Sequence, residues 1–295
     1  MMRRLLPLLL LATVGVSCTD VIDLETDFTT PELVVDAWLT DQPEPQTIRL
    51  TLSQDFYDNR LPAGVEDAEV VVCVNESLED CKVFVHQDSG RYVWTPEAGQ
   101  TIGEIGDDFT LGIRQGGTDY LSQTTMRRTA IIDSIAVRLE EEQLGLDEGL
   151  YAQLYARDQV GLGDAYLVRT TINDTLLNRP QELNLVYDAT FDAGSGTDGI
   201  TFIFPIRFNI NKLDDDGGFV ALEQGDRIEV EVWSLSQEAF FFLSVARDQL
   251  QNSDNGIFQI PVANSPGNVI NLATEEPVLG IFNVSAVSTA SQTVE

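Results

Sequence analysis

The amino-acid sequence predicts a mainly β protein with two β-sandwich-like domains, the first immunoglobulin-like and the second containing one buried helix. Short runs in which apolar and polar residues alternate recur along most of the chain, and this period of two is typical of half-buried strands. Clusters of Gly, Pro, Asp and Ser separate the runs. The chain has 295 residues, of which 43% are hydrophobic, so it can bury a large core and is long enough for two domains.

The first 17 residues are typical of a secretory signal peptide. Arg3 and Arg4 precede an apolar run over residues 5–16, which is shorter than the roughly 20 apolar residues that a membrane-spanning helix needs. The sequence Gly15-Val16-Ser17-Cys18 resembles a bacterial lipobox, in which the cysteine is lipidated and becomes the first residue of the mature chain. We therefore expect residues 1–17 to be removed and Cys18 to carry the lipid. The alternative is an ordinary signal peptide with an incidental cysteine.

A short acidic segment, residues 18–27, begins at the predicted lipid attachment site. It contains Asp20, Asp23, Glu25 and Asp27, and we expect it to lie in water as a tether. Each buried methylene of an acyl chain contributes about 0.8 kcal/mol, so two or three chains would hold a folded domain on a membrane. Acids directly after a lipid-bearing cysteine also resemble a signal for export to the cell surface.

The charge balance is strongly acidic, with 17 Lys and Arg against 48 Asp and Glu and a net charge of −31. Removing residues 1–17 takes away two arginines and no acid, which leaves a net charge of −33. Nucleic-acid binding is therefore not expected, because it needs Lys and Arg to displace counterions from phosphates. The same charge argues against attraction to anionic lipid, so the predicted acyl chains must supply the membrane contact.

Residues 28–125 are predicted to form the immunoglobulin-like β-sandwich. Seven short strands within about 100 residues are typical of that fold. Residues 47–53 alternate most clearly, with Ile48, Leu50 and Leu52 on one face. The predicted strands span residues 33–39, 47–53, 68–74, 81–86, 91–94, 109–114 and 120–124.

Cys73 and Cys81 are the two cysteines that follow Cys18. An exported chain meets an oxidising compartment, so we expect them to form a disulfide rather than to stay free thiols. The loop between them is short, and its closure would contribute on the order of 2.5 kcal/mol. His86 is the only histidine and has no metal-ligand partner nearby in the sequence, so neither a metal site nor a catalytic role is predicted for it.

Residues 130–295 are predicted to form a β-rich C-terminal domain. Pro205 lies within one of its runs, which must then be at an edge or a bulge because proline cannot donate a ladder hydrogen bond. The predicted strands span residues 131–139, 150–156, 165–172, 183–187, 200–210 and 227–233, with a last core strand over 277–285.

One helix is predicted in this domain, near residues 237–251. Ser236 is a good N-cap, and Leu235 and Phe240 occupy the positions of a hydrophobic staple on either side of it. The helix has more apolar residues than one face can hide. We therefore expect it to be buried against the sheet, with a groove or an interface with a partner as the alternative.

No catalytic, cofactor or metal site is predicted from the sequence. Asp214, Asp216 and Gly217 match part of a calcium loop but lack the bidentate Glu at the required spacing, so a solvated turn is favoured while calcium stays open. The Gly-rich residues 191–199 lack Lys and a phosphate-binding pattern, and no Gly-x-Ser-x-Gly occurs. A pair of carboxylates for glycoside hydrolysis stays open, since 48 acids offer many pairs and the sequence gives no distances.

Several short motifs occur in a characteristic order, from Leu33-Val34-Val35-Asp36-Ala37-Trp38-Leu39 to Leu279-Gly280-Ile281-Phe282. Between them lie Asp67-Ala68-Glu69-Val70, Gly90-Arg91-Tyr92, Phe109-Thr110-Leu111-Gly112-Ile113, Gly117-Thr118-Asp119-Tyr120, Ile132-Asp133-Ser134-Ile135 and Gly225-Asp226. Together with the lipobox, they resemble the domain-of-unknown-function 4249 family over nearly the whole mature chain. The resemblance implies a Bacteroidota-type outer-membrane lipoprotein, all-β with little helix, of a kind often encoded beside TonB-dependent outer-membrane transporters. It carries over no catalytic residues.

These observations lead to the expectation of a non-enzymatic lipoprotein of the outer membrane, at the cell surface. It would be an accessory or binding partner of a TonB-dependent β-barrel transporter in nutrient uptake, without nucleic acid or cofactor. A structural or adhesive surface protein is the first alternative, and a surface hydrolase is the second.

Overall fold

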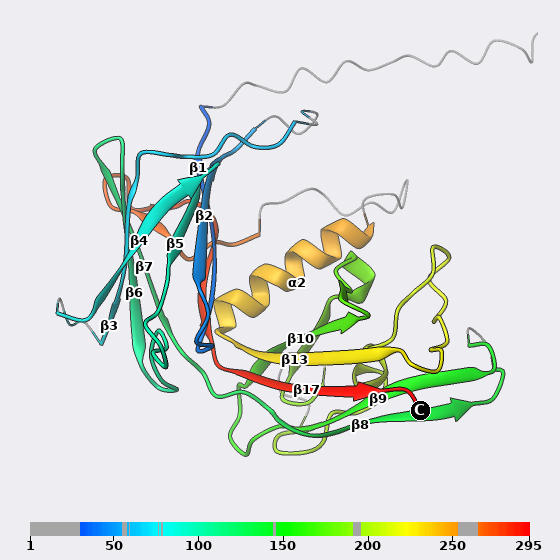
Figure 1. The fold of residues 1–295 in the computed structure, drawn as a ribbon. Coiled ribbons are helices and arrows are strands. Elements are labelled where there is room, and N and C mark those ends of the chain that lie inside the picture. The colour runs from blue at the N-terminus through cyan, green and yellow to red at the C-terminus, as the bar shows by residue number, and fades with distance from the viewer. Residues whose placement is uncertain are drawn as a thin grey trace, which may run out of the picture. The chain divides into compact units, whose positions relative to one another are not determined.

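The computed structural model describes residues 30–54, 58, 60–75, 77, 79–143, 146–190, 196–252 and 265–295. Residues 31–54 and 59–295 form one compact unit. The predicted mainly β fold is confirmed, and one α-helix is present in the described part of the chain (Figure 1). The predicted leader, Cys18 and the tether lie outside the described residues.

The first sheet contains all seven strands that the sequence predicts for residues 28–125. Three further strands, from residues 270–285, join it. The order in the ten-stranded sheet is β15-β14-β7-β6-β3-β4-β5-β2-β1-β16. Its strands are β1 (Leu33–Thr40), β2 (Gln46–Leu52), β3 (Glu69–Val74), β4 (Cys81–Asp88), β5 (Arg91–Trp94), β6 (Asp108–Gln115), β7 (Thr118–Thr125), β14 (Ile270–Asn271), β15 (Glu276–Pro277) and β16 (Leu279–Ser285).

β4 is shared between the two halves of this sheet. Its first residues pair with β3, as in Val70 opposite Phe84, and its last residues pair with β5, as in His86 opposite Tyr92. The register shifts between His86 and Asp88, and such an irregularity increases the local bend and twist of a strand. The two halves thereby face each other over one core, which includes Val35, Leu50, Val72, Phe109 and Phe282.

β16 runs parallel to β1 and brings the C-terminal region into the first sheet. Gly280 lies opposite Val35 with a φ of +98°, and a Cβ at Gly280 would lie 1.9 Å from the Val35 carbonyl oxygen. Only glycine tolerates both this φ and this approach of the two backbones. Residues 270–285, which the sequence analysis placed in the C-terminal domain, thus complete the N-terminal sheet.

The second sheet is antiparallel, with the order β11-β10-β13-β17, and β12 also pairs with β10. The β8–β9 hairpin supplies Ala152 and Leu154 to a core shared with Tyr166 and Val230 of this sheet. The strands are β8 (Ile131–Glu140), β9 (Gly149–Arg157), β10 (Ala165–Ile172), β11 (Thr175–Leu176), β12 (Asn184–Tyr187), β13 (Arg227–Leu235) and β17 (Val287–Thr293).

One sequence prediction in this region is wrong, and one strand was not predicted. Residues 200–210 form turns and the short 3-10 helix η3 (Ile206–Phe208) instead of a strand, and the Phe204–Pro205 peptide bond is cis. Some of their apolar residues are nevertheless buried, and Phe202 and Ile206 belong to the core that the hairpin shares with the second sheet. β17 was not predicted, because Val287–Thr293 consists mainly of Ser and Thr and owes its conformation to pairing with β13.

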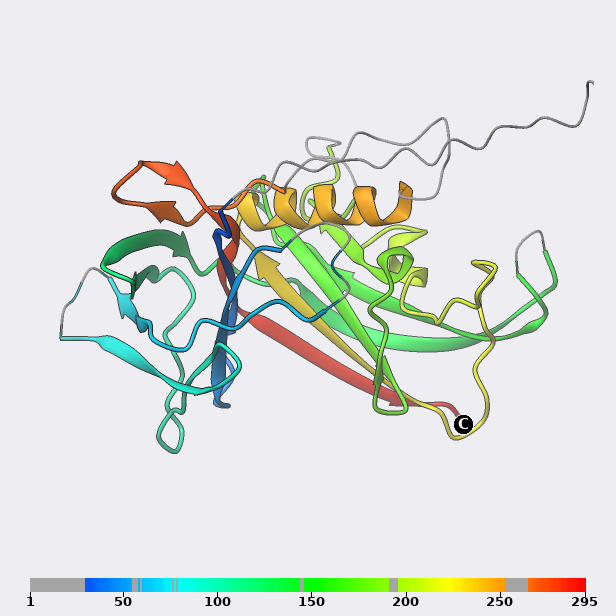
Figure 2. The same ribbon diagram turned by 90° about the horizontal axis from the view of Figure 1, so that it is seen from above.

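The predicted helix is present as α2 (Gln237–Asn252). The backbone N–H of Ala239 donates to Ser236 Oγ at 3.1 Å, which confirms the N-cap. Ala239 and Phe240 are buried in a cluster with Leu235 and Ile281, whereas Phe241 and Leu250 are 53% and 57% exposed. Figure 2 shows α2 lying across strands of the second sheet, so the sheet hides one side of the helix and leaves the other exposed.

A buried polar network joins β13 to β16. Asn283 Nδ2 donates to Ser285 Oγ at 2.9 Å, and Ser285 Oγ donates to the Ser234 carbonyl at 2.7 Å. The Ser236 N–H donates to Asn283 Oδ1 at 2.9 Å, which fixes the start of α2. Because these side chains are hydrogen-bonded within the interior, the network fixes how the two sheets meet.

Candidate functional site

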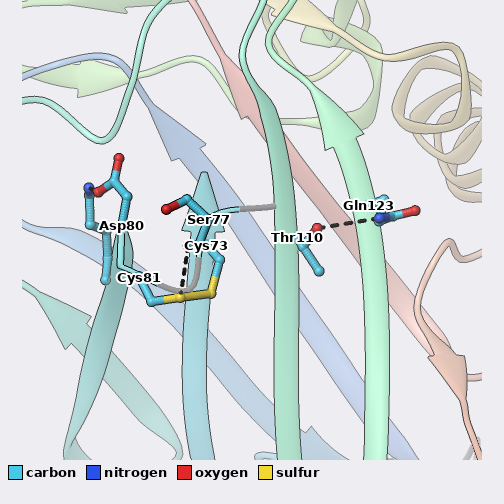
Figure 3. The surroundings of a disulfide bond; sticks show 7 residues. Cys73, Ser77, Asp80, Cys81, Thr110 and Gln123 are labelled. Carbon is cyan, nitrogen blue, oxygen red and sulfur yellow. Dashed lines mark hydrogen bonds and ion pairs between the residues drawn. A yellow bond between two sulfur atoms is a disulfide. The ribbon is translucent and has the colours of Figure 1, made fainter. Parts of the chain in front are cut away.

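The predicted disulfide between Cys73 and Cys81 is confirmed. The two cysteines are cross-strand partners on β3 and β4. Cys73 is also opposite Thr110 of β6, and Thr110 is opposite Gln123 of β7, so a single row crosses four strands. Figure 3 shows this row, with the disulfide at one end and the hydrogen-bonded pair Thr110 and Gln123 at the other.

This row leads to a polar depression of about 330 Å³ at the ends of β6 and β7. The depression also borders the start of α2 and the segment that connects the two sheets. Its lining residues are Asp108, Phe109, Thr110, Gln123, Thr124, Thr125, Arg127, Ser236 and Glu238.

Strand register and a helix cap hold these side chains in place. Asp108 is opposite Thr125, and the Thr125 hydroxyl donates to Asp108 Oδ1 at 2.5 Å. Gln123 Nε2 donates to Thr110 Oγ1 at 3.4 Å on the same strands. Ser236 is fixed by its capping bond to Ala239, so the helix begins at the rim of the depression.

The lining combines one positive charge with two negative charges. Arg127 is exposed and forms no ion pair within the described residues, and Asp108 and Glu238 are exposed carboxylates. Thr124 is buried, and its Oγ1 has no hydrogen-bond partner in the described structure. This mixture of donors and acceptors can hold a small polar ligand. The sequence analysis did not predict this site, because its lining residues come from segments more than 100 residues apart.

His86 lies away from this depression. It is on β4, where its ring packs 5.2 Å from the ring of Tyr92, and its Nε2 is buried without a partner in the described structure. The hydroxyl of Ser236 therefore has no histidine beside it to act as a base, because His86 is the only one in the chain.

The Asp214–Asp216 loop is held by its own hydrogen bonds. Asp214 Oδ1 accepts from the N–H groups of Asp216 and Gly218 at 2.9 and 2.8 Å, and Arg179 Nη1 lies 3.5 Å from Asp215 Oδ1. Within the described residues, no group of three or more His, Cys, Asp or Glu side chains is arranged to hold a metal ion. The carboxylate of Asp214 therefore binds the backbone of its own turn, and the positive charge beside Asp215 comes from Arg179.

A cluster of buried carboxylates and the partly buried Arg128, which the sequence analysis did not single out, closes the loop between β9 and β10. Arg128 donates to both oxygens of Asp164, with Nη2 2.5 Å from Oδ2, and to the carbonyl of Gly161 at 2.9 Å. Tyr166 Oη donates to Asp158 Oδ1 at 2.6 Å, and Asp188 Oδ1 accepts from two loop N–H groups. These carboxylates are therefore occupied in holding the loop.

Burial and hydrogen bonding set the protonation of this cluster. Burial raises the pKa of the Asp158 carboxyl, although the hydrogen bonds from Tyr166 and from the Gly199 N–H partly offset this effect. Burial, together with the hydrogen bond to Asp158, raises the pKa of Tyr166. The hydrogen bond to Asp164 raises the pKa of Arg128, so Arg128 stays charged.

The predicted lipid attachment site and part of the Gly-rich segment, for which no site was predicted, lie outside the described residues. Cys18 is that attachment site, and of the Gly-rich segment 191–199 only residues 196–199 are described. Within the described residues, no helix is long and apolar enough to cross a membrane.

Comparison with known families matches residues 19–291 to a family described as domain of unknown function DUF4249. The chain belongs to the DUF4249 family. The match covers nearly the whole sequence, including the first sheet, α2 and most of β17. No curated protein matches the chain.

Proposed function

We propose that this DUF4249 chain is a non-enzymatic lipoprotein, anchored through Cys18 on the outer membrane at the cell surface. There it works as an accessory or binding partner of a TonB-dependent transporter in nutrient uptake. The observation that carries the proposal is the leader over residues 1–17 and the lipobox-like Gly15-Val16-Ser17-Cys18, followed directly by the region that matches the family.

The geometry supports a binding role better than a catalytic one. The depression at the end of the first sheet offers charged and hydroxyl groups from strands and from a helix terminus, which are rigid elements. A ligand held there would contact Arg127, Asp108 and Glu238 without meeting a nucleophile paired with a base. A lipid tether would raise the effective concentration of this surface near a membrane partner without any new contact.

The anchor is tested with the Cys18→Ser variant. We expect the wild-type chain in the membrane fraction and the variant in the soluble fraction, because the only predicted acyl attachment site is removed. A Cys73→Ser/Cys81→Ser variant, which keeps Cys18, is the matched control and should stay with the membrane. Membrane retention of the Cys18→Ser variant would overturn the lipid anchor.

The partner is tested by purifying the tagged, lipidated chain from native outer membranes in a mild detergent and identifying co-purifying proteins by mass spectrometry. A β-barrel transporter in stoichiometric amount is the expected result. If the chain is recovered alone while known membrane complexes survive, the accessory role is wrong. An adhesive role, or turnover in a screen of glycan and peptide substrates, would then take its place.

A further inference from the structure

Two arginines from different elements contact the same tyrosine ring beside the β8–β9 hairpin. The guanidinium carbon of Arg138, on β8, lies 5.7 Å from the centre of the Tyr155 ring, and that of Arg207, in η3, lies 5.4 Å from it. Both distances are within the range of cation–π contacts. One ring is therefore contacted by two positively charged side chains, on a chain whose net charge is −31.

Neither of these arginines has a carboxylate partner in the part of the chain that the structure describes. Eight other arginines in that part do form ion pairs with Asp or Glu. Acids are abundant, with 48 in the sequence, so two arginines that contact the same ring without such a partner are notable. The pair keeps its positive charge available for an external anion.

Arg207 carries a further sign of a missing partner. Its Nε–H is buried and has no acceptor within the described structure. Buried donors in native proteins are satisfied in the great majority of cases, and an exception calls for a bound ion, ligand or water. This Nε–H is therefore a donor that the described protein itself does not satisfy.

Glu140, which is linked to Tyr155 through Gln153, forms no ion pair with either arginine in the described residues. Tyr155 Oη donates to Gln153 Oε1 at 3.1 Å, and Gln153 Nε2 donates to Glu140 Oε1 at 3.0 Å. Asp133, which is also on β8, is paired with Arg157 at 2.7 Å. These bonds fix the tyrosine hydroxyl and leave the two guanidinium groups without a carboxylate.

We propose that Arg138, Tyr155 and Arg207 form a binding site for an oxyanion: a sulfate, a phosphate or a carboxylate. The planar fork of a guanidinium donates two parallel hydrogen bonds to such a group, and the cation–π contact with the ring restrains each guanidinium group before the anion binds. The same chemistry occurs in a free ion, in an acidic sugar and in a phospholipid headgroup. The site does not depend on the proposed anchor or on the transporter.

The test uses the lipidated full-length chain in neutral detergent, titrated calorimetrically with sodium sulfate, sodium phosphate, sodium glucuronate and glycerol 1-phosphate at constant ionic strength. We expect saturable binding of at least one probe and a loss of affinity of at least about tenfold in Arg138→Gln/Arg207→Gln. Preference for glucuronate would indicate an acidic sugar, and preference for glycerol 1-phosphate would indicate a headgroup.

Two controls separate binding from folding. Arg114→Gln removes an exposed, ion-paired arginine from the first sheet and should leave the affinity unchanged. Arg207→Lys keeps the charge but loses the fork, so it should weaken binding even where circular dichroism shows a native fold. The proposal is overturned if no probe binds saturably, if both glutamine substitutions leave the affinity unchanged, or if Arg114→Gln weakens binding equally.

Discussion

A disulfide bond closes the loop between β3 and β4. The loop between β9 and β10 is instead held by charged side chains that contact it. Cys73 and Cys81 are directly opposite each other, so the disulfide that closes the first loop joins a cross-strand pair of residues. In the second loop, Asp158 and Asp164 are only 4% and 8% exposed, and Arg128 is the cation that contacts Asp164 and the loop backbone.

The disulfide and the charged cluster affect stability through different states of the chain, the unfolded state and the folded state. A disulfide stabilises mainly by restricting the unfolded chain, so its contribution depends little on charge. A buried ion pair acts in the folded state, where removing one partner leaves an uncompensated charge. The C-terminal region should therefore respond more strongly than the first sheet to single substitutions and to pH.

The largest effect is expected for Arg128→Met, which leaves Asp164 buried without its cation. The free energy of unfolding should fall by about 3 kcal/mol, as measured by urea denaturation at pH 7. The control is Arg157→Met, because Arg157 forms an exposed pair with Asp133 and should cost less than about 1 kcal/mol. Equal losses in the two variants would mean that burial of the Asp164 pair does not matter.

An intermediate effect is expected for Cys73→Ser/Cys81→Ser. Opening the short loop should lower the free energy of unfolding by about 2.5 kcal/mol, because the unfolded chain gains conformational freedom. Reduction of the wild-type chain should give the same loss, and reduction of the double variant should give none. A larger loss in the double variant than in the reduced wild type would point to poor packing of the serines instead.

The two regions also differ in how much of their fold could be predicted from the sequence. In the first sheet, alternation is regular because one face of each strand is buried, as with Ile48 and Leu50 against Thr47 and Arg49 on β2. Strand membership of residues 279–285 was also predictable. Their parallel pairing with β1 was not, because nothing local in either strand specifies the partner.

Local signals were weaker in the C-terminal region. Phe202, Ile206 and Ile210 are fully buried, but they pack around a 3-10 turn, and apolar density alone does not distinguish this arrangement from a strand. The disulfide was predictable from two cysteines and a leader. Neither the polar depression nor the pair of arginines on Tyr155 was, because each gathers residues from elements far apart in the sequence.

The smallest effect is expected for a substitution of Glu182 in the short helix η2 (Pro180–Glu182). It tests whether the stability of the C-terminal region depends on pH more strongly than that of the first sheet. Glu182 is 8% exposed and receives a hydrogen bond from Arg179 Nη2 at 3.0 Å. Burial opposes its ionisation, but hydrogen bonds from Arg179 and from the Leu213 N–H outweigh burial and lower the pKa of Glu182. Arg179 also donates to the carbonyls of Leu213 and Asp214, so this pair holds the Asp214–Asp216 turn.

Because the pKa of Glu182 is lowered in the folded state, the ionised carboxylate stabilises the fold above the unfolded pKa of about 4.3. Glu182→Gln should therefore cost about 1–2 kcal/mol at pH 7, and the difference from wild type should vanish as the pH falls through the folded pKa. Urea denaturation from pH 3 to 7 measures this, with Glu229→Gln as the exposed control. If the difference in the free energy of unfolding persisted at pH 3, the packing of the Glu182 side chain rather than its charge would stabilise this turn. The stability contributed by this turn would then depend on pH no more than that contributed by the disulfide.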